Sequence, residues 1–288
     1  MNRFSEIFFN SYNSSMRSAY DACMMPPRDS SSDSFTDAEG TDLQYCLDHE
    51  YGKWLSEQLP EIGKTPCEYM DEAGFEEITE MFCDGAEICD DEMPAIYLDK
   101  LLYYGDKAID FLIGTAMKIN TGQGEESPAP SVMAVRILGR QKSGKAVLPL
   151  INVLDASRGI SELMQETARD ALNGIGHTAV DLIIQEMSSG NRSDETCEYL
   201  VMSLAEIGKD CRSDEIYLAL KNAFHQLPDK VVTADCLANY GDGRAIPALR
   251  GYLLKNGEDI SRESFYDIVS AVRRLGGRID DLKQVRER

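Results

Sequence analysis

The sequence predicts an all-α protein, an α-solenoid of stacked antiparallel helical hairpins with an acidic helical N-terminal region. Three observations lead to this prediction. A phrase of apolar residues that ends in glycine recurs along residues 92–288, acidic residues are concentrated before it, and the apolar residues follow helical spacing. Self-similarity with a period of about 20 to 50 residues is typical of repeat proteins, in which neighbouring units stack.

In the first part of the chain, we predict a helix over residues 1–25 and a flexible linker over residues 26–41. The linker sequence, PPRDSSSDSFTDAEGT, contains a single large apolar residue, so it cannot contribute much to a packed core. The helix would carry its apolar side chains at the spacing that places them on one face. These side chains are Phe4, Phe8, Tyr12, Ala19 and Cys23.

Residues 42–91 are predicted to form an acidic helical region. Thr41 or Asp42 can cap a helix that runs to about Leu59, because a short polar side chain accepts from the free N–H groups of the first turn. Pro66 is expected to open a second helix, since its missing N–H costs nothing there.

Carboxylates are concentrated in the same part of the chain. Residues 1–130 hold 27 acidic and 8 basic side chains, whereas residues 131–288 hold 23 acidic and 21 basic ones. The stretch Glu68–Asp99 has twelve carboxylates and no Lys, Arg or His. Such a run is either a solvated face or a surface that docks a basic partner. The candidate docking residues are Glu76, Glu77, Glu80, Glu87, Asp90 and Asp91.

Residues 92–288 carry six copies of the repeat phrase. In each copy an apolar residue is followed by two variable residues, a second apolar residue and glycine, and the glycines are separated by 34, 37, 32, 33 and 35 residues. The copies are LLYYG (101–105), VRILG (135–139), LNGIG (172–176), LAEIG (204–208), LANYG (237–241) and VRRLG (272–276).

The phrase has the chemistry of a hairpin corner. Residues four and one before the glycine lie on the same side of a helix, and glycine adopts the left-handed conformation that ends a helix at low cost. We therefore expect Leu204 and Leu237, each four residues before its glycine, to be buried between stacked hairpins. Second helices are expected to begin near Ala108-Ile109, Ala146-Val147, Ala179-Val180, Glu215-Ile216 and Ala245-Ile246.

The segment LANYGDGRAIPALRGYL (237–253) resembles the HEAT-like repeats of the phycobilisome-lyase type, and so do residues 134–154 and 168–187. The resemblance covers roughly residues 92–282 and implies an α-solenoid whose second helices line a concave face. Its members include bilin lyases, DNA-repair glycosylases and binding scaffolds, so the resemblance does not decide the function.

The second helices supply the candidate binding residues. When these helices are aligned on their first apolar residue, five side chains fall outside the apolar stripe and have the mixed chemistry of a polypeptide-binding surface. They are Asn152, Asp181, Gln185, Tyr217 and Lys221. The alternative is that each of them is merely solvated.

No catalytic or metal-binding pattern emerges from the sequence. The histidines at 49, 177 and 225 are far apart and have no partner base in view. Cys83 and Cys89 are separated by a spacing that is not typical of zinc sites, and no histidine accompanies them. Trp54 is expected to anchor the core. We therefore expect a protein that is not an enzyme and uses no cofactor or metal.

Charge and hydropathy limit the classes of partner that we expect this chain to bind. The repeat region is nearly neutral and the rest is acidic, which disfavours nucleic acid. No apolar run is long enough to cross a membrane, and the scattered cysteines favour a cytoplasmic protein. The expected function is a scaffold for a protein partner. A bilin-lyase-like enzyme or enzyme subunit, and an acidic immunity or decoy protein that neutralises a basic protein, remain as alternatives.

Overall fold

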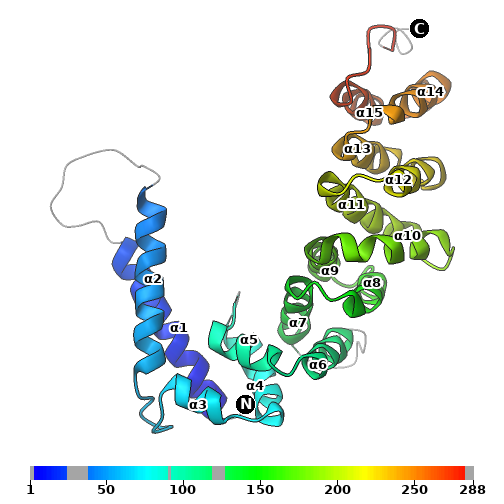
Figure 1. Ribbon diagram of the computed structural model, residues 1–288. Helices are drawn as coiled ribbons and strands as arrows, with labels where there is room; N and C mark the ends of the chain where they lie inside the picture. Colours follow the sequence, from blue (N-terminus) through cyan, green and yellow to red (C-terminus); the bar gives the residue numbers. More distant parts are fainter. Residues whose placement is uncertain (1–2, 25–37, 90–91, 119–126, 283–288) are drawn as a thin grey trace, which may run out of the picture. The chain divides into compact units, whose positions relative to one another are not determined.

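The computed structural model describes residues 3–24, 38–89, 92–118 and 127–282, and these are all-α, with no strand among them (Figure 1). Within these residues, no helix is both long and apolar enough to cross a membrane. The chain divides into two compact units, one of residues 1–111 and 125–133 and the other of residues 112–124 and 134–288.

Among its described residues, the first unit contains five whole helices, the beginning of a sixth and the first residues of a seventh, α7 (Ala129–Arg140). The predicted linker lies mostly outside the described residues. The second helix starts inside it, at Ala38, and ends at Ser56, so the predicted start at Thr41 or Asp42 and the predicted end near Leu59 are wrong. The bounds are α1 (Arg3–Met24), α2 (Ala38–Ser56), α3 (Pro66–Glu72), α4 (Phe75–Ile88) and α5 (Ala95–Leu102), followed by α6 (Asp106–Ala116). The expected opening of a helix at Pro66 is confirmed, with Thr65 and Glu68 forming a capping box in front of it.

Aromatic rings form the core of the first unit. The Phe8 ring meets the Trp54 ring at 5.3 Å between centroids, and the Phe9 ring meets the Tyr97 ring at 5.2 Å. Trp54 is buried as predicted, and its indole Nε1 donates to the Ser11 hydroxyl at 3.0 Å. This bond satisfies the one polar group that a buried Trp carries.

The predicted apolar face of α1 is partly wrong. Phe4, which was expected on the buried face, is exposed, whereas Phe9, which was not, is buried. The reason lies on α4, where a Cβ on Gly85 would come within 2.5 Å of the Phe9 ring. The missing side chain of this glycine makes room for Phe9, and helical spacing within α1 cannot reveal that space.

The second unit packs its helices in sequence order. The row α9, α11, α13 and α15 lies beside the row α8, α10, α12 and α14 (Figure 1). We call the first of these the first-helix row and the other the second-helix row. The bounds are α7 (Ala129–Arg140), α8 (Val147–Ala156), α9 (Glu162–Ile175), α10 (Val180–Ser188), α11 (Asp194–Asp210), α12 (Asp214–Gln226), α13 (Lys230–Tyr240), α14 (Ile246–Asn256) and α15 (Arg262–Arg274).

The corner between α13 and α14 shows how the repeat phrase works. Gly241 has φ of 77°, the left-handed conformation, and its N–H bonds to the Leu237 carbonyl. The Asp242 side chain then accepts from Arg244 N, and Pro247 lies in the first turn of α14, both as predicted. Positive φ also occurs at the phrase glycines 105, 176 and 276.

Two of the six phrase glycines do not end a helix, contrary to the prediction. Gly139 lies inside α7 and Gly208 inside α11. A Cβ on Gly139 would lie 2.6 Å from the Ala171 Cα, and one on Gly208 would lie 2.7 Å from the Tyr240 ring. These glycines are therefore explained by the close approach of the following first helix.

The predicted core leucines are confirmed. Leu204 and Leu237 are both 0% exposed, on α11 and α13 of the first-helix row. Ser or Asp caps the first turns of five helices, because its side-chain oxygen accepts from a free N–H there. The capping residues are Ser161, Ser193, Ser213, Asp229 and Ser261.

Candidate functional site

The register of the second helices differs from the prediction at α12. In α8 and α10, Val147 and Val180 are followed three residues later by a fully buried residue. In α12 this relation holds for Tyr217 and Leu220. Tyr217 is accordingly only 6% exposed, so it belongs to the apolar stripe and does not escape it. The prediction aligned α12 one residue too early, on Ile216, because both Ile216 and Tyr217 are buried in this helix and spacing alone does not distinguish them.

The corrected register brings three amide side chains to equivalent positions. Asn152 on α8, Gln185 on α10 and Asn222 on α12 each lie two residues after an equivalent buried residue. Asn222 thus takes the place assigned to Lys221, which is half-buried. Sequence reasoning missed Asn222 because it aligned α12 on Ile216.

Asn152 is tied into the framework by Arg192. The Arg192 Nη2 donates to Asn152 Oδ1 at 2.8 Å, and its Nε donates to Glu186 Oε2 at 2.8 Å. Its Nη1 also lies 3.7 Å from Asp155 Oδ2, and this carboxylate accepts from the Thr196 hydroxyl. This largely buried guanidinium joins α8, α10 and α11, so Asn152 serves the packing of the helices.

A groove of about 400 Å³ lies between α10 and α12. We call it the α10/α12 groove. Its apolar lining is Ile184, Met187, Leu218, Ala219, Ala223 and Leu227, and Cys197 of α11 contributes as well. Burial raises the pKa of the Cys197 thiol, so this side chain is neutral near pH 7.

The α10/α12 groove is open to a ligand. Leu218 is 51% exposed although it is a large aliphatic side chain. Asn222 and Gln226 line the groove from α12, and Glu215 is the one charged residue of its lining. Of the residues proposed from sequence, Asp181 and Gln185 are exposed on α10 beside it. Apolar walls with a few polar groups are typical of ligand-binding grooves.

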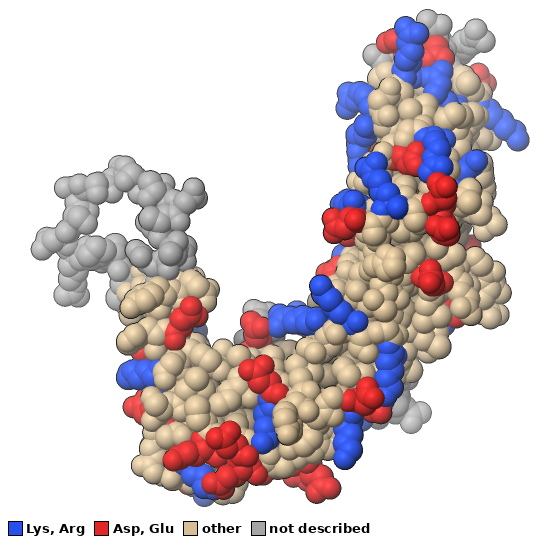
Figure 2. Space-filling view, in the orientation of Figure 1, with Lys and Arg blue, Asp and Glu red and all other residues tan. Residues whose placement is uncertain are grey.

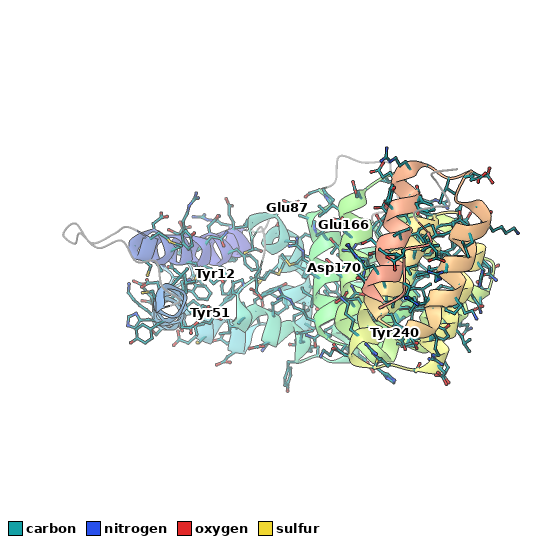
Figure 3. All side chains as sticks on the ribbon, turned by 90° about the horizontal axis from the view of Figure 1, so that it is seen from above. Tyr12, Tyr51, Glu87, Glu166, Asp170 and Tyr240 are labelled. Carbon is teal, nitrogen blue, oxygen red and sulfur yellow. The ribbon has the colours of Figure 1, made fainter. Side chains whose placement is uncertain are left out.

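The first-helix row carries a second hollow surface that sequence reasoning missed. Two adjoining depressions, of about 660 and about 720 Å³, share Asp170 on α9. Figure 3 shows Glu166 and Asp170 together on this helix. Its charges are largely paired: Arg169 bonds to Asp170 at 2.9 Å, and Arg274 bonds to Asp235. Salt bridges on the surface add little to the stability of the fold, and charges that are already paired offer a ligand few free partners.

Acidic side chains form a stripe on α4. Glu76, Glu80 and Glu87 are exposed, and their spacing places them on one helical face together with the exposed Cys83. Figure 2 shows acidic side chains gathered over the part of the molecule where Figure 1 places α3 and α4. Glu77 is half-buried and accepts from the Tyr69 hydroxyl at 2.7 Å. The proposed Asp90 and Asp91 lie outside the described residues.

Two half-buried tyrosines of the first unit lie close together. Tyr12 and Tyr51 lie in the α1–α2 part of this unit (Figure 3), with ring centroids 6.1 Å apart. Burial raises the pKa of Tyr12 to about 12. The Tyr51 hydroxyl accepts from Ile96 N at 2.8 Å and thereby caps the first turn of α5. These groups support packing.

The candidate catalytic residues are not brought together. His49, His177 and His225 are each exposed, on α2, on the turn before α10 and on α12. Within the described residues, no three His, Cys, Asp or Glu side chains are arranged to hold a metal ion.

No family model, no curated protein and no solved structure matches this chain. The α10/α12 groove and the acidic stripe of α4 therefore have to be interpreted from their own chemistry.

Proposed function

We propose that this chain is a non-enzymatic scaffold that binds a polypeptide partner, and that residues 92–288 form an α-solenoid of HEAT-like repeats. The observation that carries the proposal is the α10/α12 groove, in which the exposed Leu218 faces open space beside free amide groups. Exposed apolar patches rimmed by polar residues mark interaction sites, because leaving such surface in water is costly.

The repeat interpretation rests on the helix order and the corners. Each helix pair is too small to bury its own apolar face, so it depends on its neighbours in the stack. The rows in the second unit, and the positive φ of Gly241 and Gly176 between paired helices, support this interpretation. In such an arrangement the second-helix row would supply the concave binding face.

Site-specific photo-crosslinking tests the proposed function. The crosslinking residue replaces Leu218 in one sample and Leu254 of α14 in the other, since Leu254 is 54% exposed and lies outside the groove. In native cell extract, we expect a protein adduct at position 218 that is missing at position 254. Identical adducts at both positions, or none at 218, would contradict a polypeptide site in this groove.

The acidic stripe of α4 supports a second binding surface, for a basic protein. Glu76, Glu80 and Glu87 repel one another on one helical face unless a positive surface approaches them. An immunity or decoy protein would use the same stripe. The triple variant Glu76→Lys, Glu80→Lys and Glu87→Lys should lose partners that the unaltered chain captures at low salt and releases at high salt. If those partners remain bound to the variant, the stripe only solvates the protein.

The enzyme alternative makes a different prediction. A bilin-lyase-like enzyme would need a nucleophile or base beside its substrate, and His177 and His225 are exposed singly. Incubation of the chain with a bilin and an acceptor protein, followed by mass measurement of the acceptor, distinguishes the two. We expect no covalent bilin adduct.

A further inference from the structure

We propose that the α10/α12 groove recognises an extended polypeptide segment in which an aliphatic side chain is followed or preceded closely by Lys or Arg. This inference rests on the proposed function and specifies its ligand. Four features lead to it: the apolar walls of the groove, the carboxylate of Glu215 in its lining with that of Asp181 on α10, its amide groups and its lack of basic lining residues.

The walls of the groove accept an aliphatic side chain. Ile184 and Met187 on α10 face the groove from one helix, and Leu218 faces it from the other. A volume of about 400 Å³ holds one or two aliphatic side chains with some backbone. Covering the exposed part of Leu218 removes apolar surface from water, which is the main driving force for association.

Two carboxylates favour a cation at one end of the groove. Glu215 lies one turn before Leu218 in α12, and Asp181 lies one turn before Ile184 in α10. Both are exposed, and neither forms an ion pair or hydrogen bond with the described part of the chain. Each lies in the first turn of its helix, and α10 and α12 occupy equivalent places in their row, so we assign both carboxylates to the N-terminal end of the two helices. A Lys or Arg of the ligand would pair with them.

The amide groups favour an extended ligand over a helical one. Asn222 and Gln226 line the groove one turn apart on α12 and have no hydrogen-bond partner among the described residues. An amide side chain both donates and accepts, so it can pair with a peptide N–H and C=O. An extended segment has such groups free, whereas a helix uses its own.

The same lining disfavours nucleic acid and anionic lipid. No Lys or Arg lines the groove, and Glu215 would repel a phosphate group. The nearby Lys221 is half-buried and does not belong to the lining.

A random peptide library displayed on phage tests the inference with the full chain as bait. We expect enriched peptides to contain Leu, Ile, Val or Met within three residues of Lys or Arg. A synthetic copy of an enriched peptide, followed by fluorescence anisotropy, should bind the variant Leu218→Asp at least about tenfold more weakly. The matched control Leu254→Asp should bind the peptide with the affinity of the unaltered chain. Circular dichroism and Tm verify that both variants fold, as expected for exposed positions.

A charge-reversed chain provides the decisive comparison. The double variant Asp181→Lys and Glu215→Lys should select peptides with Asp or Glu beside the aliphatic residue. Selection of the same basic peptides by this variant overturns the inference, and so does equal binding to Leu218→Asp. Peptides that bind elsewhere without the aliphatic and basic pattern overturn the inference alone. A library that yields no peptide binder overturns the proposed polypeptide-binding function as well.

Discussion

Single side chains of the first-helix row hold the second unit together. Leu204 and Leu237 are fully buried on neighbouring first helices, α11 and α13. Their helices pack against one another, and a helix pair in such a stack depends on its neighbours to bury its apolar face. Removing either side chain leaves a cavity that the rigid helices cannot fill completely.

Replacement of Leu237 by Ala should lower the free energy of unfolding by about 2 to 5 kcal/mol. The same loss is expected for Leu204→Ala, since both are 0% exposed. Urea unfolding followed by circular dichroism measures the change. The matched control is Leu254→Ala, an exposed leucine of the same unit, which should change stability by no more than about 0.5 kcal/mol.

The Asp242 carboxylate at the α13–α14 corner stabilises the fold in a pH-dependent way. The Arg244 guanidinium bonds to both carboxylate oxygens of Asp242, and this hydrogen bonding holds the pKa of Asp242 below its ordinary value. Arg244 also stacks on the Tyr217 ring, 4.2 Å from its centroid, and bonds to Asp214 at 2.8 Å. The corner is thus joined to the start of α12.

Asp242→Asn isolates this charge, because Asn retains the capping oxygen. A depressed folded-state pKa means that the ionised form stabilises the fold at pH values above about 4 and that the contribution is lost as pH falls further. The unaltered chain should therefore be more stable than the variant at neutral pH, and the gap should close with acidification. Urea unfolding across this pH range measures it, and a gap independent of pH would contradict the assignment.

At the scale of the helices, close packing of α7 against α9 and of α11 against α13 depends on two glycines. Gly139 lets α7 approach Ala171 of α9, and Gly208 lets α11 approach the Tyr240 ring of α13. Tyr240 is held in place because its hydroxyl bonds to both the N–H and the C=O of Ser213. The ring therefore has little freedom to move away from an added methyl group.

Gly139→Ala should destabilise the chain by about 1 to 3 kcal/mol, since its Cβ would meet backbone that cannot shift cheaply. Gly251→Ala is the matched control on α14, where nothing lies within 4 Å of the new Cβ. That substitution should instead stabilise the helix by up to about 1 kcal/mol. Thermal and urea unfolding measure both variants. Equal effects at the two positions would mean that the close approach between α7 and α9 is absent.

At the scale of the whole molecule, charge is the dominant long-range force. The net charge is −21, and most of it belongs to the first 130 residues. The acidic stripe of α4 adds short-range repulsion between Glu76 and Glu80, which are one turn apart. Self-repulsion of this kind opposes the compact state and is weakened by salt.

Moderate salt should therefore raise the Tm of the chain relative to low salt. Glu80→Lys should raise the low-salt Tm slightly, by relieving a repulsive pair worth a few tenths of a kcal/mol, and should reduce the further gain from salt. Differential scanning calorimetry at about 0.01 and about 0.15 M ionic strength tests both effects. A Tm that is insensitive to salt in both proteins would show that the carboxylates are already neutralised.

Features that depend on residues close together in the chain follow from local sequence alone. The helical class, the corner at Gly241, the helix start at Pro66 and the burial of Leu204 and Leu237 follow from local spacing and backbone conformation. Each is decided within one or two helical turns, where periodicity is informative.

Features that depend on neighbouring helices emerge only when the helices pack together. Gly139 is needed for the approach of a helix about thirty residues away, and Tyr217 is buried in α12 beside Ile216 although the predicted register placed it outside the apolar stripe. The α10/α12 groove likewise exists only where two helices separated by a third lie side by side. Packing between distant segments determines these positions, and it leaves no periodic signal within any single helix.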